Sequence, residues 1–497
     1  MPEISENKKI SVDVRMYRQG LGDCFLLTFK RAEKSDFHMM IDCGLLQGTE
    51  NSTEIMTEVA ENIRQTTAEA EGGKGRIDVV AVTHEHWDHI SGFSQARAVF
   101  DNIDFKEVWV GWTEDDNHPQ SKPMRERFRK QILGLQAALT QMDSDRFEGM
   151  RENVRSLVEE FFATDVLGAN KMGRSETWEY ILGKGLDRKF CSPGKILTHP
   201  ELEGVRFYIL GPPEDYETFT KTEPSKKDAE SETYRDSEKF ALADSVFAAV
   251  TESNDIFDTD ANLPFERDPR IMVKADDQSV NTRFESYFAS ENDWRKIDDD
   301  WMMMVGQLAL NLDSYTNNSC LAFAIELVES GKILLFPGDA QFGNWISWKD
   351  LSWEILDKHN HKTTVTTADL LNRTVLYKVG HHGSHNATLR EHGLEMMNSP
   401  ELVAMIPVDR KKAASKTTKT NPKGWEMPQE HLFKRLQEKA KGRVIIADEA
   451  TNDDLDIRCS NNKLHIIEKE TFLGKVKFAE EETENLKPLY VKYVIEE

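Results

Sequence analysis

The chain has 497 residues, of which 39% are hydrophobic and 30% are charged, and its 63 basic and 87 acidic residues leave a formal net charge of -24 at pH 7. This composition is that of a globular protein and excludes a collagen-like or wholly disordered chain. Because no apolar run approaches the ~20 residues of a membrane helix and the N-terminus has no apolar signal core, we expect a cytoplasmic protein without a membrane partner.

The first 110 residues predict a β-rich segment with one helix. Alternation of apolar and polar residues predicts a half-buried strand over residues 10–17, and short apolar runs predict the strands that follow it. Gly20-Leu21-Gly22-Asp23 forms a turn before the second strand, and Asp42-Cys43-Gly44 ends the third. The further expected elements are strands over residues 24–29, 37–41 and 77–82 and a helix over residues 53–68.

The rest of the chain alternates between helical patterns and strands, so the sequence predicts an α/β protein. Residues 214–300 carry 24 acidic against 11 basic residues and few periodic apolar runs, which indicates an acidic insertion. Helices are expected over residues 121–163 and 294–312, and strands over residues 205–210, 321–327, 332–336, 374–379, 402–407 and 444–447. The predicted division is two halves of one domain at 1–110 and 305–470, a mainly helical insertion at 111–204, a core strand at 205–213, an acidic insertion at 214–304 and a C-terminal extension at 471–497.

The strongest functional signal is the pattern His84-x-His86-x-Asp88-His89, which follows directly on the strand predicted over residues 77–82. A strand end keeps its backbone in the sheet while it delivers side chains into a cleft. Imidazole and carboxylate donors suit zinc, manganese or iron. A tight turn can direct His84 and His86 at one cation, and Asp88 and His89 at a second. The alternative is a polar loop with incidental histidines.

Two further strand ends carry donors of the same kind. Asp339 follows a Pro-Gly turn after the strand over residues 332–336, where a carboxylate can bridge two metals, and the pair His381-His382 follows the strand over residues 374–379. Alone, each signal is weak, because a Gly-Asp pair is usually a turn. The shared geometry of all three predicts a binuclear site, in which two cations activate water and stabilise both oxygens of a displacement.

Taken in chain order, these motifs resemble those of the metallo-β-lactamase fold superfamily, and more finely those of the soluble hydrolase domain of the ComEC competence proteins and its stand-alone relatives. The resemblance covers residues 10–110 and 305–450. The matching motifs are Gly20-Leu21-Gly22-Asp23, Ile41-Asp42-Cys43-Gly44, the His84 to His89 pattern, Asn317-Asn318-Ser319-Cys320, Gly338-Asp339 and Gly380-His381-His382-Gly383-Ser384. The resemblance implies an αββα sandwich with helical and acidic insertions and two divalent metals at one edge, with zinc favoured and manganese as the alternative.

The resemblance also implies which residues hold the metals. One metal would be held by His84 and His86, the other by Asp88, His89 and His382, and Asp339 would bridge the two. His382 is preferred to His381 because a ligand histidine directly before glycine is the commoner superfamily pattern. Many members supply a further histidine to the first metal from a strand between the two halves. No histidine stands at the corresponding residues 210–213 here, so the third protein ligand of that metal stays open.

The roles implied for the remaining residues concern catalysis and substrate. His381 would contact a phosphate or protonate the leaving group, which makes it the expected catalytic residue beside Asp88. Asp42 would accept a hydrogen bond from a ligand histidine and fix its tautomer. The expected substrate-binding residues are Asn318, Ser384, His385, Lys411 and Lys412. The two lysines belong to a basic loop over residues 410–423 that suits a phosphate backbone, with a solvated loop as the alternative.

These expectations describe a metal-dependent hydrolase in which a metal-bridged hydroxide attacks phosphorus, most simply a phosphodiesterase or nuclease with DNA or RNA as substrate. Nucleic acid as the substrate is supported by analogy with the family alone. Two other functions are retained from the residue pattern. The first is hydrolysis of a small ester, a lactone or a phosphocholine-type substrate, and the second is a non-catalytic metal-binding interaction protein.

Overall fold

The computed structural model describes residues 10–32, 34–128, 175–221, 232, 314–357, 361–417, 423–449, 451–479 and 488–497. The chain divides into two compact units, one made of residues 1–125, 159–237 and 314–497 and the other of residues 126–158 and 238–313. Apart from residues 126–128, the described residues belong to the first unit. The helix predicted over residues 294–312 lies outside the described residues, as do most of the helix predicted over residues 121–163 and most of the acidic insertion.

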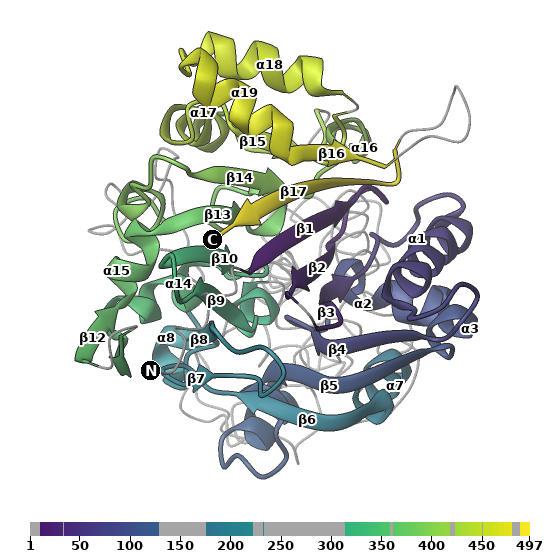
Figure 1. Ribbon diagram of the computed structural model, residues 1–497. Helices are drawn as coiled ribbons and strands as arrows, with labels where there is room; N and C mark the ends of the chain where they lie inside the picture. Colours follow the sequence, from purple (N-terminus) through teal and green to yellow (C-terminus); the bar gives the residue numbers. More distant parts are fainter. Residues whose placement is uncertain are drawn as a thin grey trace, which may run out of the picture. The chain divides into compact units, whose positions relative to one another are not determined.

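The first unit contains an eight-stranded sheet in the order β16-β17-β1-β2-β3-β4-β5-β6 (Figure 1). Its strands are β1 (Ser11–Tyr17), β2 (Cys24–Lys30), β3 (Phe37–Cys43), β4 (Gly75–Ala81), β5 (Ile103–Gly111), β6 (Gly185–Cys191), β16 (Val476–Phe478) and β17 (Tyr490–Glu496). The strands from β3 to β6 are parallel, and the remaining pairs are antiparallel. The parallel part therefore needs crossovers, which are formed by α1 (Ser52–Thr67), α2 (Trp87–Gln95), α3 (Arg97–Phe100) and α7 (Glu176–Lys184).

A second, seven-stranded sheet has the order β15-β14-β13-β10-β9-β8-β7. Its strands are β7 (Ile196–Leu197), β8 (Val205–Gly211), β9 (Ala322–Leu327), β10 (Lys332–Phe336), β13 (Thr374–Lys378), β14 (Val403–Ile406) and β15 (Val444–Ile446). The strands β10, β13, β14 and β15 are parallel. A separate hairpin pairs β11 (Ser352–Leu356) with β12 (Lys362–Thr366).

The remaining helices are mostly short and accompany the second sheet and the C-terminal part of the chain. The α-helices are α8 (Tyr216–Phe219), α14 (Phe342–Ser347), α15 (Thr367–Asn372), α16 (Arg410–Ser415), α17 (Glu430–Lys439), α18 (Asn452–Asn461) and α19 (Ile466–Lys475). The 3-10 turns are η1 (Trp112–Glu114), η5 (Trp348–Asp350), η6 (His381–Gly383) and η7 (Leu394–Met396). In the part of the chain that the structure describes, no helix is both long enough and apolar enough to span a bilayer.

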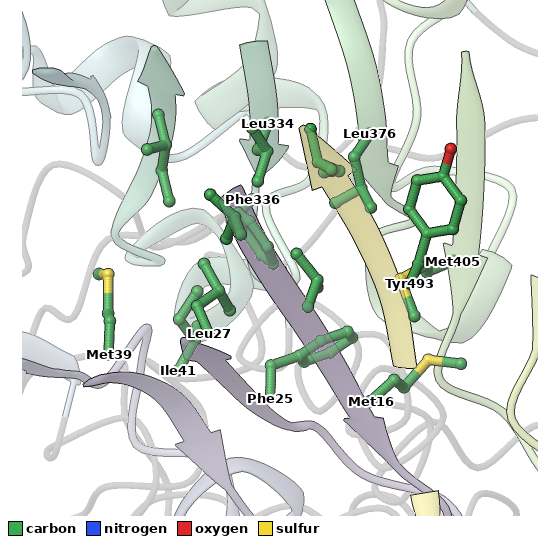
Figure 2. Packing of buried hydrophobic residues seen from close by; sticks show 14 of the residues in the cluster. Met16, Phe25, Leu27, Met39, Ile41, Leu334, Phe336, Leu376, Met405 and Tyr493 are labelled. Atoms are coloured by element: carbon green, nitrogen blue, oxygen red, sulfur yellow. The ribbon is translucent and has the colours of Figure 1, made fainter. Parts of the chain in front are cut away.

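The two large sheets pack face to face around one apolar core (Figure 2). Phe25 of β2 meets Phe336 of β10 edge to face at 5.9 Å between ring centroids, and Trp109 of β5 meets Phe207 of β8 at 4.9 Å. A second apolar cluster fills the space between the other face of the first sheet and helices α1, α2 and α7. Helix α1 contributes residues at helical spacing, so the same pattern that predicted it also determines which face is buried.

The prediction of a mixed α/β protein is confirmed, and the strands that frame the predicted donors are present near the expected residues. The strands β6 and β7 lie inside the segment expected to be a mainly helical insertion, and β16 and β17 lie in the expected C-terminal extension. Edge strand β6 is polar and mostly exposed or half-buried, so it carries no apolar signal. Strand β17 does alternate, with Val491, Tyr493 and Ile495 buried, and that signal at the chain end was overlooked.

Candidate metal centre

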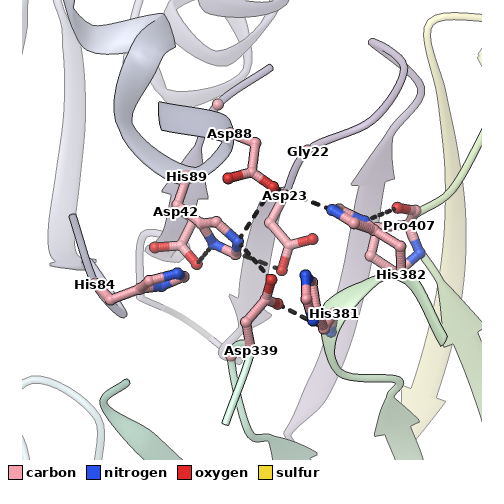
Figure 3. A network of polar contacts seen from close by, with 12 residues as sticks. Gly22, Asp23, Asp42, His84, Asp88, His89, Asp339, His381, His382 and Pro407 are labelled. Carbon is pink, nitrogen blue, oxygen red and sulfur yellow. Dashed lines mark hydrogen bonds and ion pairs between the residues drawn. The ribbon is translucent and has the colours of Figure 1, made fainter. Parts of the chain in front are cut away.

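The donor residues gather because several parallel strands end at the same edge of their sheets. Strand β3 carries Asp42 near its end, and the neighbouring parallel strand β4 leads into His84. In the second sheet β10 leads into Asp339, and its parallel neighbour β13 leads into His381 and His382. Figure 3 shows these side chains pointing toward one another. The six predicted metal ligands are all buried: His84, His86, Asp88, His89, Asp339 and His382.

The first ligand loop, residues 83–89, is held by a carboxylate on the neighbouring strand. Asp42 accepts hydrogen bonds from the backbone N–H of Thr83, from its hydroxyl and from Nδ1 of His89, each at 2.8 Å. Because Nδ1 of His89 is engaged in this way, Nε2 is the nitrogen turned into the centre. It lies 3.1 Å from Oδ2 of Asp339. The hydrogen bond from His89 to Asp42 is thus present, as the resemblance implies, and it fixes the orientation of this imidazole.

The second ligand loop, residues 380–383, combines a strained backbone with hydrogen bonds to its surroundings. His381 and His382 adopt left-handed conformations with φ of 45° and 53°, which strain any residue that has a Cβ atom. Nδ1 of His382 donates to the backbone carbonyl of Pro407 at 2.6 Å, and Nε2 lies 3.1 Å from Oδ2 of Asp88. Non-glycine residues with a left-handed backbone are often found at functional sites, and these two histidines adjoin the donor cluster.

Asp339 connects the two loops. Its Oδ2 faces His89 of the first loop, while Oδ1 accepts the backbone N–H of His381 in the second loop at 3.0 Å. Among the described residues, three groups have ligand atoms that all lie within 4.8 Å of one another. They are His84 with His89 and Asp339, Asp88 with Asp339 and His382, and Asp23 with Asp42 and His89. Asp339 belongs to the first two groups, so the structure places it between two sets of donors.

The donor chemistry fits a divalent cation. His84 Nε2 and Asp88 Oδ1 are buried atoms that have no hydrogen-bond partner within the described ranges. Such atoms normally require a partner, and a cation at this position would supply one. Buried histidine and aspartate groups of this kind could hold a metal ion. His86 lies outside the three groups but adjoins His84, with 4.6 Å between the ring centroids.

The pKa values in the cluster separate neutral from charged donors. Burial lowers the pKa of His84 well below its usual value, and burial also lowers the pKa of His86 to about 3. Burial alone would lower the pKa of His89 as well, but nearby carboxylates, Asp339 above all, raise it well above its usual value. Burial opposes ionisation of Asp339, yet His89 and Lys378 hold its pKa well below the usual range. Near pH 7, His84 and His86 are therefore neutral, while a protonated His89 faces an ionised Asp339.

The predicted substrate-binding residues have different surroundings. Ser384 directly follows the second ligand loop, and its hydroxyl donates to Asn386 Oδ1 at 2.9 Å; His385 beside it is half-buried. Lys412 on α16 is half-buried with Nζ 3.5 Å from the backbone oxygen of Gln19, whereas Lys411 is exposed. Residues 418–422 of the basic loop lie outside the described residues.

Asn318 has a role in the architecture of the fold. Its Nδ2 donates to the backbone oxygens of Phe219 and Lys221 at 3.0 and 2.8 Å, and its Oδ1 accepts the N–H of Asn344 at 3.1 Å. All of its polar atoms are thus used to join α8 to α14, and the structure does not bring it into the donor cluster.

Two buried charged residues beside the ligands were missed as site residues. Asp23 ends the Gly20 to Asp23 turn, and Lys378 is the last residue of β13. A signal existed for Lys378, because it is the single charge in the otherwise uncharged run Val375 to Val379. A scan of the chain against protein-family models finds no match, and a search of curated proteins finds no similar one.

Proposed function

We propose that this protein is a metal-dependent hydrolase of the metallo-β-lactamase type that acts on phosphodiesters and is nuclease-like. The observation that supports this most is the convergence of buried histidine and aspartate donors from two sheets on one place. Two sheets packed face to face, with helices α1, α2 and α7 on the outer face of the first, are also what an αββα sandwich requires. The ComEC-type hydrolase domain is the closer resemblance in the order of the motifs.

The residues proposed to hold two divalent cations, zinc in preference to manganese, are His84, His86, Asp88, His89, Asp339 and His382. When bound, such cations lower the pKa of water and neutralise charge on phosphate oxygens. Asp42 keeps His89 in one tautomer with Nε2 facing inward. Burial lowers the pKa of His381, so its imidazole is neutral near pH 7. This favours hydrogen bonding to a phosphate oxygen over protonation of the leaving group.

The basic helix α16 supports a phosphate-containing substrate. Lys412 rests against the Gly20 to Asp23 turn, where a Cβ added to Gly20 would lie 2.7 Å from Lys412 Nζ. The same turn adjoins the first ligand loop, because the backbone N–H of Asp23 donates to the oxygen of Asp88 at 3.0 Å. Lys411 and Lys412 would thus be near a phosphate backbone bound at the centre and could contact it.

The test is a hydrolysis panel. Protein stripped with a chelator and reloaded with zinc or manganese is incubated with DNA, RNA, a small phosphodiester and small carboxyl esters. We expect phosphodiester cleavage that disappears on stripping and falls at least about 100-fold in Asp339→Ala and His86→Ala. His361→Ala, a change at an exposed histidine in the hairpin β11–β12, serves as the matched control and should keep full activity.

The other outcomes are equally informative. Cleavage of carboxyl esters alone would assign the second enzyme class, and tight metal binding with no hydrolysis of any substrate would assign a non-catalytic interaction protein. Unchanged turnover in Asp339→Ala would reject the metal mechanism itself.

A further inference from the structure

Lys378 places a charge in the interior of the second sheet. Every residue of β13 is buried, and Lys378 at its end is only 2% exposed. Moving an ammonium group out of water costs several kcal/mol unless it is paired and hydrogen-bonded. The burial of this lysine therefore requires partners that satisfy it.

The partners of Lys378 account for its whole hydrogen-bonding capacity. Its Nζ donates to the backbone oxygen of Gly338 at 2.9 Å and to Oδ1 of Asp339 at 3.1 Å, and it forms a close ion pair with Oδ2 of Asp23. An ammonium group has three N–H bonds, so each acceptor takes one of them. The side chain consequently has one defined position.

The two oxygens of Asp339 are left with different surroundings. Oδ1 receives both the ammonium of Lys378 and the backbone N–H of His381. Oδ2 faces Nε2 of His89, one of the proposed metal ligands. Two hydrogen bonds therefore fix Oδ1 of Asp339, while Oδ2 faces the proposed cation site.

Asp23 holds the lysine from the opposite side. Its backbone N–H donates to Asp88 and its backbone oxygen accepts the N–H of Gly44 at 2.9 Å. The turn is also tightly packed, since a Cβ added to Gly22 would lie 2.4 Å from the oxygen of Gly44. Asp23 is thus fixed to the first ligand loop, and its ion pair holds Lys378 beside that loop.

We propose that Lys378, held by Asp23, is a positioning residue of the cation centre. It occupies Oδ1 of Asp339, so that only Oδ2 is presented to the cations. The proposal rests on the proposed metal centre and adds to it a residue that determines which oxygen of Asp339 would be open to a cation. It also assigns a task to the Gly20 to Asp23 turn, which carries Asp23 and adjoins the first ligand loop.

The deciding experiment is a crystal structure of the wild-type protein loaded with manganese. We expect Oδ2 of Asp339 at coordination distance, about 2.0–2.2 Å, and Oδ1 still hydrogen-bonded to Lys378. Both oxygens coordinated, with Lys378 displaced from Asp339, would overturn the proposal. Absence of any bound manganese would instead count against the metal centre, so the two failures are distinguishable.

Electron paramagnetic resonance of the manganese-loaded protein provides a solution test. Lys378→Met removes the ammonium and leaves Oδ1 with only the backbone N–H of His381, so the spectrum of the coupled manganese pair should shift, whereas Lys378→Arg should retain the wild-type spectrum. Lys492→Met on β17, which breaks an ion pair with Asp13 of β1, is the matched control and should also leave the spectrum unchanged. A wild-type spectrum in folded Lys378→Met would contradict the positioning role. If Lys378→Met does not fold, the wild-type crystal structure still decides.

Discussion

The two ligand loops arrive at the same centre but are held there by different means. Residues 83–89 are organised by Asp42, a buried carboxylate that accepts three hydrogen bonds. Residues 380–383 rely on two left-handed histidines, on bonds from His382 to the carbonyl of Pro407 and to Asp88, and on the backbone N–H of His381, which donates to Asp339. The comparison teaches that a single carboxylate on a neighbouring strand can order the first loop and orient its histidine together, whereas in the second loop two carboxylates, a carbonyl and a strained backbone share these tasks.

The largest expected effect comes from removing the carboxylate of the first loop. Asp42→Ala leaves the buried donors of Thr83 and His89 without their acceptor, so the free energy of unfolding should fall by about 3–5 kcal/mol. Urea denaturation of the metal-stripped protein measures it. His382→Ala removes two buried bonds, to Pro407 and to Asp88, instead of three, so it should lower the free energy of unfolding by less. An equal loss in the two variants would show that the loops are held alike.

Close backbone packing around the first loop should give the next largest effect. A Cβ at Gly44 would lie 2.2–2.3 Å from backbone atoms of Asp88 and His89, so Gly44→Ala has to displace the ligands. We expect a loss of about 1–3 kcal/mol in unfolding free energy and weaker manganese binding by titration. Gly183→Ala in α7, where a Cβ meets nothing within 4 Å, is the control and should be neutral or stabilising. If Gly44→Ala were as stable as the wild-type protein, close packing at Gly44 would be refuted.

Backbone strain in the second loop predicts a smaller effect on stability. The preference between glycine and alanine should be opposite in the two loops. At His381, with φ of 45°, glycine should be more stable than alanine by about 1 kcal/mol because it removes the Cβ clash. At His89 of the first loop, which lies inside helix α2, alanine should be more stable than glycine by about 0.5–1 kcal/mol. Thermal unfolding of the four single variants tests both orders. The same order at both positions would mean that the second loop is unstrained.

The smallest expected effect lies outside both loops, on α16. Lys411→Ala should weaken the binding of DNA and reduce the slope of log affinity against log salt by about 0.9, because one fewer phosphate is neutralised. Fluorescence anisotropy at several salt concentrations measures the slope. Lys434→Ala, at an exposed lysine on α17, is the control and should leave the slope unchanged. Equal slopes in both variants would remove Lys411 from the substrate surface.

Local patterns were sufficient for much of this protein. The α/β class follows from apolar runs of strand length separated by helical spacing, and His84 to His89, Asp339 and the pair His381-His382 follow from donor residue types placed directly after such runs. These signals need only neighbouring residues, because the period of a strand and the end of a strand are local properties.

Tertiary structure alone decided how these residues are joined. His382 meets Asp88 across 294 positions of sequence, and Asp23 meets Lys378 across a similar span, so no local pattern could pair them. It also turned Asn318 toward the backbone of α8, and it placed polar β6 at the sheet edge. The physical reason is that hydrogen-bond partners of buried polar groups are chosen by the packing of whole sheets, which brings distant strand ends together.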